Sequence, residues 1–193
     1  MILAKSRTPL VKIYLSSSQL CDKESTALYA AKELRYYLGR ITCASFEIAK
    51  SDSTAPGIYI GDAAQIDTSS LGEDGFRVLT EGDRLLIAGG NRGVIYGVYE
   101  FLESLGCRFF TSTCEKIPTV DELVIGDYDV KQVPRIEYRE HNYSDAVQNP
   151  RFSVRCRFNG AHHNVPSHMG GCMRYAWFVH TFEKMVPPSV YGK

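Results

Sequence analysis

The chain has 193 residues, of which 44% are hydrophobic and 23% are charged, and its 22 basic and 22 acidic side chains give a formal net charge of zero. This length can bury a substantial core, and the composition is ordinary for a globular protein. The balanced charge argues against a surface for nucleic acid or for an anionic membrane, and no apolar run approaches the roughly 20 residues of a membrane-spanning helix. No signal peptide is visible in residues 1–15, although a trimmed start would look the same, so the compartment stays open.

The N-terminal part of the chain predicts a strand followed by an amphipathic helix. VKIYL at residues 11–15 alternates apolar and polar side chains, as a half-buried strand does. Asp22 is a candidate N-cap for a helix over Glu24–Leu38, in which apolar residues recur every three or four positions. Gly39 is expected to end this helix.

A run of strands follows. Residues 46–49 and 58–60 are predicted strands on either side of a loop rich in Ser, Asp, Pro and Gly. Residues 75–80 and 84–88 are predicted to form a hairpin, because Glu81-Gly82-Asp83 between them offers a glycine for the positive φ of a tight turn.

The stretch LLIAGGNRGVIYGVYEFLESLGCRFF, residues 85–110, combines a strand, a glycine turn, a second helix and another strand. Asn91 is the expected N-cap of this helix and Gly106 its expected end. Its predicted buried stripe consists of Val94, Val98, Phe101, Leu102 and Leu105. With a further strand at 122–125, the pattern predicts an α+β fold, in which a mixed β-sheet carries two helices on one face.

The segment Gly89-Gly90-Asn91-Arg92-Gly93 lies where some folds bind phosphate, between a strand and a helix N-terminus. However, it is not a GxGxxG fingerprint, and it lacks the Lys-Ser/Thr of a P-loop. Tight-turn geometry and close packing of the helix on the sheet explain these glycines better. No nucleotide or other cofactor is therefore predicted.

The composition changes after Pro134, where a separate strand is expected over Ile136–His141. Glu137, Arg139 and His141 would share one face of this strand, as on the first strand of a β/α barrel whose polar residues face the lumen. The planar fork of Arg139 could then hold a carboxylate or sugar hydroxyls. The alternative is a surface ion pair to one of the neighbouring glutamates. Residues 149–158 are predicted to be a weak, arginine-rich helix or loop, and residues 158–163 a second strand end.

All five histidines follow residue 140, and Cys172 lies among them, which raises the question of a metal site. None of them forms an HExxH or similar arrangement, so histidines that line a polar pocket at loop ends are the preferred interpretation, and no metal is predicted. Tyr175, Trp177 and Phe178 could stack on sugar rings, but ordinary core packing is favoured. The six cysteines form no CxxC pair and are expected to be mostly buried, reduced thiols.

Several segments resemble a known family of domains. AAKELRYYLGRITCASFEI at 30–48, IYIGD at 58–62 and DGFRVLTEGDRLLIAGGNRGVIYGVYEFLESLGCRFF at 74–110 resemble the N-terminal domain of alpha-glucuronidases of glycoside hydrolase family 67. They are similar also to the non-catalytic N-terminal domain of family 20 beta-hexosaminidases. PRIEYREHN, FNGAHHNVP and GGCMRYAWFVHTFEKMVPP, all after residue 133, look closest to bacterial proteins that carry domain of unknown function 4838.

The resemblance implies an accessory domain over residues 1–133 and, over 134–193, the incomplete start of a (β/α)₈-like catalytic domain. The implied function is that of a carbohydrate-active glycoside hydrolase-like protein, whose partners are an oligosaccharide substrate and either the remainder of the barrel or an oligomer partner. Catalytic carboxylates of such families lie on later barrel strands, so Glu137 and Glu140 receive no catalytic role. Arg139 is the best match in this chain to the substrate-binding arginine near the start of the family 20 barrel. The resemblance implies that the same substrate mouth is also lined by His141, Asn159, His162, His163 and His180.

Two further expectations depend on this interpretation. A barrel needs about 200 residues or more, so the residues after Pro134 should be poorly packed or should lean on another molecule. The alternative to an enzyme fragment is a stand-alone module that binds a glycan or a protein without catalysis.

Overall fold

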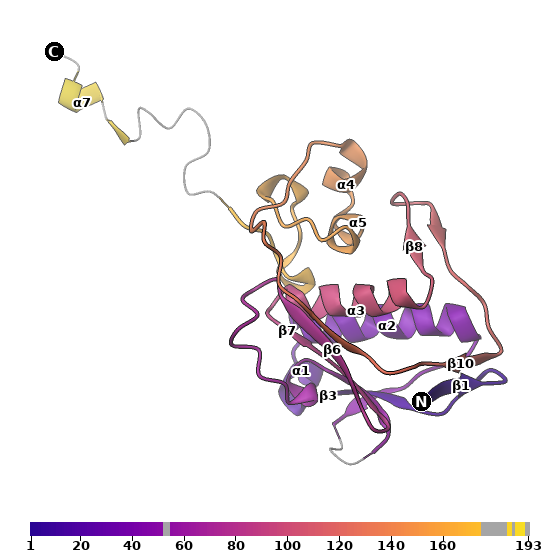
Figure 1. Cartoon of the computed structure of the whole chain (residues 1–193). Coiled ribbons are helices and arrows are strands. Elements are labelled where there is room, and N and C mark those ends of the chain that lie inside the picture. The colour runs from indigo at the N-terminus through magenta and orange to yellow at the C-terminus, as the bar shows by residue number, and fades with distance from the viewer. Residues whose placement is uncertain (52–54, 175–184, 187, 192–193) are drawn as a thin grey trace.

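The structure is a computed structural model, and it describes residues 1–51, 55–174, 185–186 and 188–191. Its centre is a mixed sheet of six strands in the order β11-β6-β7-β5-β3-β4 (Figure 1). Strands β3, β4, β5 and β7 run parallel to one another, and β6 and β11 are antiparallel to their neighbours. The strands of this sheet are β3 (Lys12–Leu15), β4 (Ile48–Lys50), β5 (Gly57–Ile60), β6 (Phe76–Glu81), β7 (Arg84–Gly89) and β11 (Asp129–Gln132).

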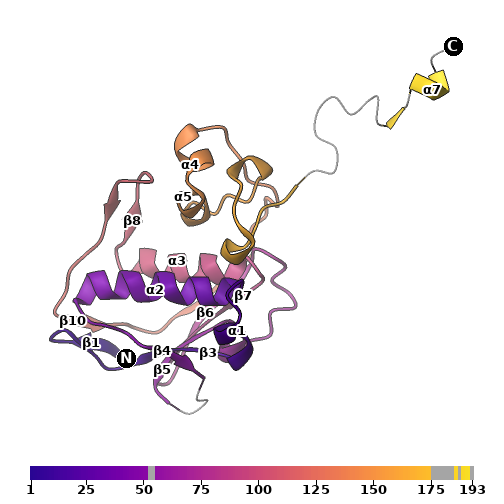
Figure 2. The ribbon, with the colours of Figure 1, turned by 180° about the vertical axis from the view of Figure 1, so that it is seen from behind.

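Two helices, α2 (Thr26–Thr42) and α3 (Gly93–Ser104), lie side by side on one face of this sheet, as both views show (Figures 1 and 2). Alternate residues of β7 point to opposite faces, so Leu85 and Ile87 enter the core beneath the helices. Leu86 packs on the other face beside a stacked pair of tyrosine rings. The predicted arrangement of one mixed sheet with two helices on one face is therefore confirmed.

The hairpin between β6 and β7 is also confirmed. Its register pairs Phe76 with Gly89 and Glu81 with Arg84. Gly82 in the turn has a φ of +59°, which glycine adopts without steric cost. The hairpin therefore forms as the sequence predicted.

The ends of α2 differ from the prediction. Ser25, not Asp22, is the N-cap, and its hydroxyl accepts a hydrogen bond from the backbone N–H of Leu28. Asp22 instead ends a short preceding helix, α1 (Ser17–Cys21), which was not predicted. Gly39 lies within α2, and the helix ends at Cys43, which takes the left-handed conformation with φ +57°.

The start of α3 explains the glycine-rich turn. Asn91 is not its cap, because Arg92 occupies the N-cap position. The side chain of Arg92 makes no capping hydrogen bond to the helix. The backbone N–H groups of Arg92 and Gly93 both donate to the carbonyl of Glu73, each at 2.9 Å. A side chain at Gly93 would collide with the carbonyl of Gly75. Close packing therefore accounts for these glycines, as the sequence indicated. Leu105 falls just beyond the helix and is only partly buried.

Several short strands were not predicted, and two of them pair with strands that are distant in the sequence. β1 (Ile2–Lys5) lies between β2 (Thr8–Pro9) and β10 (Glu122–Val124) in a small sheet, and its pairing joins Ile2 to Val124. β11 pairs with β6, and β8 (Arg108–Phe109) pairs with β9 (Glu115–Lys116). The predicted strands at the end of residues 85–110 and at 122–125 are confirmed as β8 and β10.

The segment after Pro134 is the main departure from the prediction. In the described residues 134–174 there is no strand, so the strand over Ile136–His141 and the strand end at 158–163 are both wrong. Ile136 is 69% exposed. The segment forms short helices instead: α4 (Ser144–Gln148), α5 (Pro150–Arg155), and the 3₁₀ turns η2 (Ala161–His163) and η3 (Ser167–Met169). Another 3₁₀ turn, η1 (Gly61–Ala64), follows β5, and α7 (Pro188–Tyr191) lies near the C-terminus.

The segment is nevertheless packed. Helices α4 and α5 lie over α2 and α3, on the side away from the sheet (Figures 1 and 2). Ser153, Val154, Asn159 and His163 are each no more than 1% exposed. The expectation of poor packing after Pro134 is therefore wrong for this part of the segment.

The cysteines differ from the expectation that most of their thiols are buried. Cys107 is buried, but Cys21, Cys43 and Cys114 are exposed. Among the described residues, no helix is both long and apolar enough to cross a membrane.

Candidate functional site

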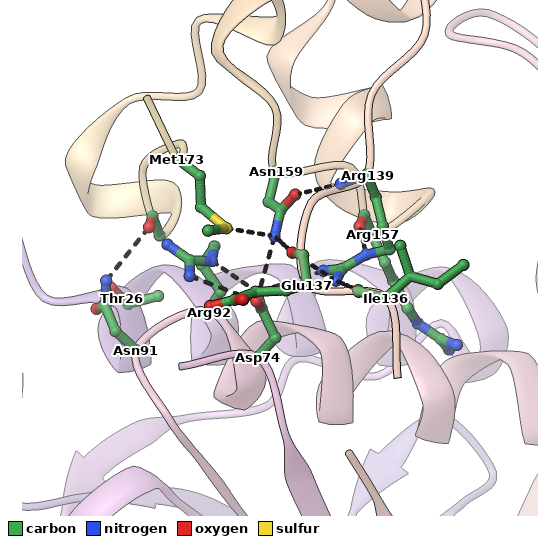
Figure 3. A network of polar contacts seen from close by, with 11 residues as sticks. Thr26, Asp74, Asn91, Arg92, Ile136, Glu137, Arg139, Arg157, Asn159 and Met173 are labelled. Carbon is green, nitrogen blue, oxygen red and sulfur yellow. Dashed lines mark hydrogen bonds and ion pairs between the residues drawn. The ribbon is translucent and has the colours of Figure 1, made fainter. Parts of the chain in front are cut away.

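Arg139 lies in a network of polar contacts between the segment 135–174 and the sheet domain (Figure 3). Its Nε donates to the carbonyl of Arg157 at 2.8 Å, and its Nη1 donates to the carbonyl of Ile136 at 2.7 Å. Its Nη2 lies 3.3 Å from Asp74 Oδ1, an ion pair that is not aligned as a hydrogen bond. The guanidinium also lies over the ring of Tyr96, 5.8 Å from its centroid. The fork of Arg139 is thus occupied by the protein itself.

Asn159 is fully buried beside Arg139. Its Oδ1 accepts from the backbone N–H of Arg139 at 2.8 Å. Its Nδ2 donates to Asp74 Oδ2 at 3.2 Å and to the carbonyl of Glu137 at 2.8 Å (Figure 3). Sequence reasoning grouped Arg139 and Asn159 correctly in space, and the structure shows that both are directed at Asp74.

Asp74 is the centre of this network, and sequence reasoning missed it. It lies in the loop before β6, and Arg92 Nε donates to its Oδ1 at 2.6 Å. The side chains of Asp74 and Arg92 are only 10% and 11% exposed. A buried carboxylate that faces two arginines and an amide is well compensated. The only available signal was an Asp next to the glycine that begins the hairpin, which is typical of an ordinary turn.

A cavity of about 400 Å³ adjoins this network. Asp74 and Arg92 form part of its wall, together with Arg135, Glu137 and Met173. Charges of both signs and apolar atoms line it together, so a small polar ligand could reach the rim of the Asp74–Arg92 pair here.

His141 and His163 come together around Phe158. The ring of His163 stacks on Phe158, with centroids 5.1 Å apart, and the ring of His141 meets Phe158 edge-on at 4.2 Å. His163 is fully buried, and its Nδ1 lies 2.8 Å from the hydroxyl of Ser153. Burial lowers the pKa of His163, which favours its neutral form. His163 is therefore a core residue of the segment.

His162 pairs with Glu140 at the surface of the same segment. Its Nδ1 lies 3.2 Å from Glu140 Oε1, and its backbone N–H donates to Oε2 at 2.9 Å. The hydroxyl of Tyr138 donates to the same oxygen at 2.7 Å. Partial burial opposes ionisation, but these hydrogen bonds hold the pKa of the Glu140 carboxyl below its usual range. Glu140 is thus a fixed acceptor that shapes the loop around Gly160.

The remaining residues singled out in the sequence cannot be placed. His180, Tyr175, Trp177 and Phe178 lie outside the described residues. Within the part of the chain that the structure describes, no group of three or more His, Cys, Asp or Glu side chains is arranged to hold a metal ion.

Four arginines of the segment each meet a carboxylate of the sheet domain, and we call this set of contacts the arginine interface. Arg151 pairs with Glu33 at 2.9 Å, and Arg155 lies 3.5 Å from Glu115. Arg157 reaches two carboxylates of α3, at 2.6 and 3.0 Å. The complete set is Arg139 with Asp74, Arg151 with Glu33, Arg155 with Glu115, and Arg157 with Glu100 and Glu103.

Each of these guanidinium groups also lies over an aromatic ring of the sheet domain. Arg151 lies over Tyr36 at 5.0 Å, and Arg155 lies over Phe109 at 4.9 Å. Arg139 and Arg157 lie over Tyr96 and Phe76. A weakly hydrated, planar guanidinium suits such a site, in which one face meets a ring and the edge meets a carboxylate.

Tyrosine hydroxyls complete the acidic side of the interface. Tyr99 Oη donates to Glu33 Oε2 at 2.6 Å, and Tyr37 Oη donates to Glu115 at 2.9 Å. Burial, with the nearby Glu33 charge, raises the pKa of Tyr99 well above its usual range, so its hydroxyl keeps its proton. Glu33 of α2 and Glu115 of β9 are therefore preorganised acceptors for the arginines of the segment.

Comparison with known proteins adds information on the family and the fold. The model of the family described as glycosyl hydrolase family 67 N-terminus matches residues 3–101. A solved structure of a family GH115 4-O-methyl-alpha-glucuronidase, with specificity for decorated arabinogalactans, is similar over 90% of this chain, with a TM-score of 0.64 and 17% identity. At that identity, the likeness shows the fold alone.

This chain spans only 29% of the GH115 glucuronidase chain. A GH138 enzyme targeting pectin rhamnogalacturonan II matches with a TM-score of 0.40 and 19% identity, over 67% of this chain and 12% of its own. No curated protein sequence matches the chain.

Proposed function

Because the chain belongs to the family of glycosyl hydrolase family 67 N-terminal domains, we propose that it is the N-terminal part of a glycoside hydrolase-like protein. In this proposal the sheet domain, residues 1–133, is an accessory domain that supports a catalytic (β/α)₈-like barrel, which residues 134–193 lead into. The substrate is a carbohydrate, and glycans that carry uronic acids are the first candidates, because the GH67 family and the similar GH115 structure both point to glucuronidases. The resemblance to family 20 and to domain of unknown function 4838 belongs to the same proposal.

The observation that carries this proposal is the arginine interface. An accessory domain is useful to a catalytic barrel only if it holds the barrel at a defined place. Four arginines, each paired with a carboxylate and each lying over an aromatic ring, fix the segment 135–174 on the sheet domain, at α2, α3, β9 and the loop before β6. A domain downstream in the chain would follow this segment. The position of the segment on the sheet domain would therefore determine where such a domain begins.

The roles of the site residues follow from their contacts. Arg139 and Asn159 position the segment through Asp74, so we assign them to support rather than to direct contact with sugar. His141 and His162 are the histidines of the segment that we propose to lie near the substrate mouth, with His163 packed behind them. His180 keeps the same proposed place on sequence grounds alone. Glu140 is committed to its hydrogen bonds with Tyr138 and His162 and receives no catalytic role.

Hydrolysis of aryl glycosides by the 193-residue chain tests this function. The expected result is no turnover of aryl glucuronides or aryl hexosaminides, because the catalytic carboxylates belong to later barrel strands. Turnover that disappears in Glu137→Gln or Glu140→Gln would contradict the proposal. The alternative, a stand-alone glycan- or protein-binding module, would gain support from glycan-array binding that is lost in Trp177→Ala.

A further inference from the structure

A second cavity lies at the carboxyl ends of the parallel strands β3, β5 and β7. Its volume is about 390 Å³, which is in the range of small-molecule sites. The chain that follows β3 supplies one wall, through Gln19, Asp22 and Thr26. Asp62, after β5, and Asn91, after β7, supply the others.

The sheet topology places this cavity where open α/β sheets bind ligands. After β3, the chain crosses through α2 to β4 on one side, and it then returns to β5 on the other side of β3. The connections that leave β3 and β5 therefore diverge above the sheet and leave a crevice outside the strand ends. Ligands bind at this kind of topological switch point as a general rule.

The lining of the cavity excludes anions. Three carboxylates contribute to it, those of Asp22, Glu24 and Asp62, and no Lys, Arg or His is among the described residues that line it. The backbone N–H groups at the start of α3, which would otherwise attract an anion, are bonded to the carbonyls of the loop before β6. A phosphate or a uronic acid would meet net negative charge here, because three carboxylates outweigh the partial positive charge at the N-terminus of α2.

The walls are held in place, and acceptors remain free. Thr26 Oγ1 donates to Asn91 Oδ1 at 2.7 Å, which joins the start of α2 to the turn before α3. Gln19 Oε1 accepts from the backbone N–H of Asp62 at 3.1 Å, which joins the first wall to the second. Among the described residues, no group donates to the carboxylate of Asp62, which is exposed. Such an acceptor suits a hydroxyl or an ammonium group.

We propose that this cavity binds a monosaccharide-sized, hydroxylated ligand without negative charge, and that it prefers an amino sugar to a neutral sugar and rejects a uronic acid. The choice of a sugar as the hydroxylated ligand rests on the proposed function, but the charge preference rests on the lining alone. The site would therefore select against the charged residue that the proposed substrate carries, so it is a second recognition site rather than part of the catalytic mouth.

This proposal is tested by following the amide chemical shifts of the whole 193-residue chain. The chain is titrated with glucosamine, glucose and glucuronate at a pH of about 6, where the amino group of glucosamine is protonated as an ordinary amine is. Glucosamine is expected to shift amides in residues 19–27, 61–62 and 89–94, glucose to do so more weakly, and glucuronate not at all. Asp62→Asn should weaken glucosamine binding roughly two- to fivefold, the worth of one exposed ion pair, and leave glucose binding nearly unchanged. Asp83→Asn, an equally isosteric change in the turn of the β6–β7 hairpin, should change neither.

Three results would overturn the proposal. One is the absence of shifts in these residues with glucosamine and glucose at tens of millimolar, an order of magnitude above a millimolar dissociation constant. Another is equal binding of glucuronate. The third is a response of these amides to calcium ions alone, which would make the cavity a cation site. None of them changes the expected lack of hydrolysis, so failure here and failure of the proposed function can be told apart.

Discussion

The two faces of helices α2 and α3 are built from different chemistry. The face towards the sheet buries apolar side chains such as Leu34, Leu38 and Phe101 in the core, and these three have no exposed surface. The opposite face presents Glu33 and Tyr99, among other polar groups, to the arginines of the segment 135–174. Apolar burial is non-directional and sets the fold, whereas paired charges require particular partners and geometry. The sheet side therefore supplies stability, and the segment side supplies position.

The largest expected effect is on the sheet side. Phe101→Ala should lower the free energy of unfolding of the whole chain by about 3–5 kcal/mol, because it empties a fully buried site between α3 and the sheet. Chemical denaturation measures this loss. Phe110→Ala is the matched control, since Phe110 is 61% exposed and its removal should cost no more than about 0.5 kcal/mol. Similar losses for the two variants would contradict the assignment of the core.

The next effect concerns the centre of the arginine interface. Asp74→Asn should destabilise the attachment of the segment by about 3 kcal/mol, because it leaves Arg92 and Arg139 with an uncharged partner in a buried place. Hydrogen exchange should accelerate in residues 158–174 and stay unchanged in β7. Asp129→Asn is the control: Asp129 also pairs with one arginine, but it is 67% exposed, so its loss should cost less than about 1 kcal/mol. Faster exchange throughout the sheet in Asp74→Asn would mean that the interface belongs to the global core.

A smaller effect should appear when the pH falls. Burial lowers the pKa of His163 in the folded chain, so His163 becomes protonated at a lower pH in the folded state than in the unfolded state. The neutral His163 therefore contributes stability that is fully present above its unfolded pKa of about 6.5. This contribution is lost as the pH falls through the lower pKa of the folded state. Thermal unfolding and exchange in α4 and α5 should show this decline on moving from neutral to mildly acidic pH.

His163→Gln tests the origin of that decline, because glutamine keeps hydrogen-bonding capacity near Ser153 but does not titrate. The variant should flatten the pH dependence over this interval. His168→Gln, a change in η3, should leave it in place. An unchanged slope in His163→Gln would assign the effect to another group.

The parts that could be predicted from the sequence are those governed by local patterns. The β6–β7 hairpin follows from Gly82 and from alternating side chains, and α3 follows from its apolar stripe. Helix ends were less predictable, because α2 continues through Gly39, where intrinsic propensity would favour an end. The strands β1 and β11 were not predicted, because part or all of their pairing joins residues far apart in the sequence, as between Ile2 and Val124.

The candidate site could be predicted only in part, for the same reason. Arg139 and Asn159 were both assigned to one predicted mouth together with four histidines, and these two residues do meet. Their common partner, Asp74, is separated from Asn159 by 85 positions, and nothing local marks it as buried. The alternation at 136–141 suggested a strand, but no neighbouring strand pairs with these residues in the described part of the chain. Their backbone bonds to the side chain of Asn159 instead.

Hydrogen exchange of the full chain at two salt concentrations tests the central claim most directly. Between about 0.05 M and 0.5 M salt, screening should weaken the partly exposed pairs of Arg151 and Arg157 and accelerate exchange in α5 roughly two- to fivefold. The amides of β7 and of the buried half of α3 should keep their rates, because apolar packing is not screened. Unchanged exchange in α5, or an equal acceleration in β7, would contradict the view that charge holds this segment in place.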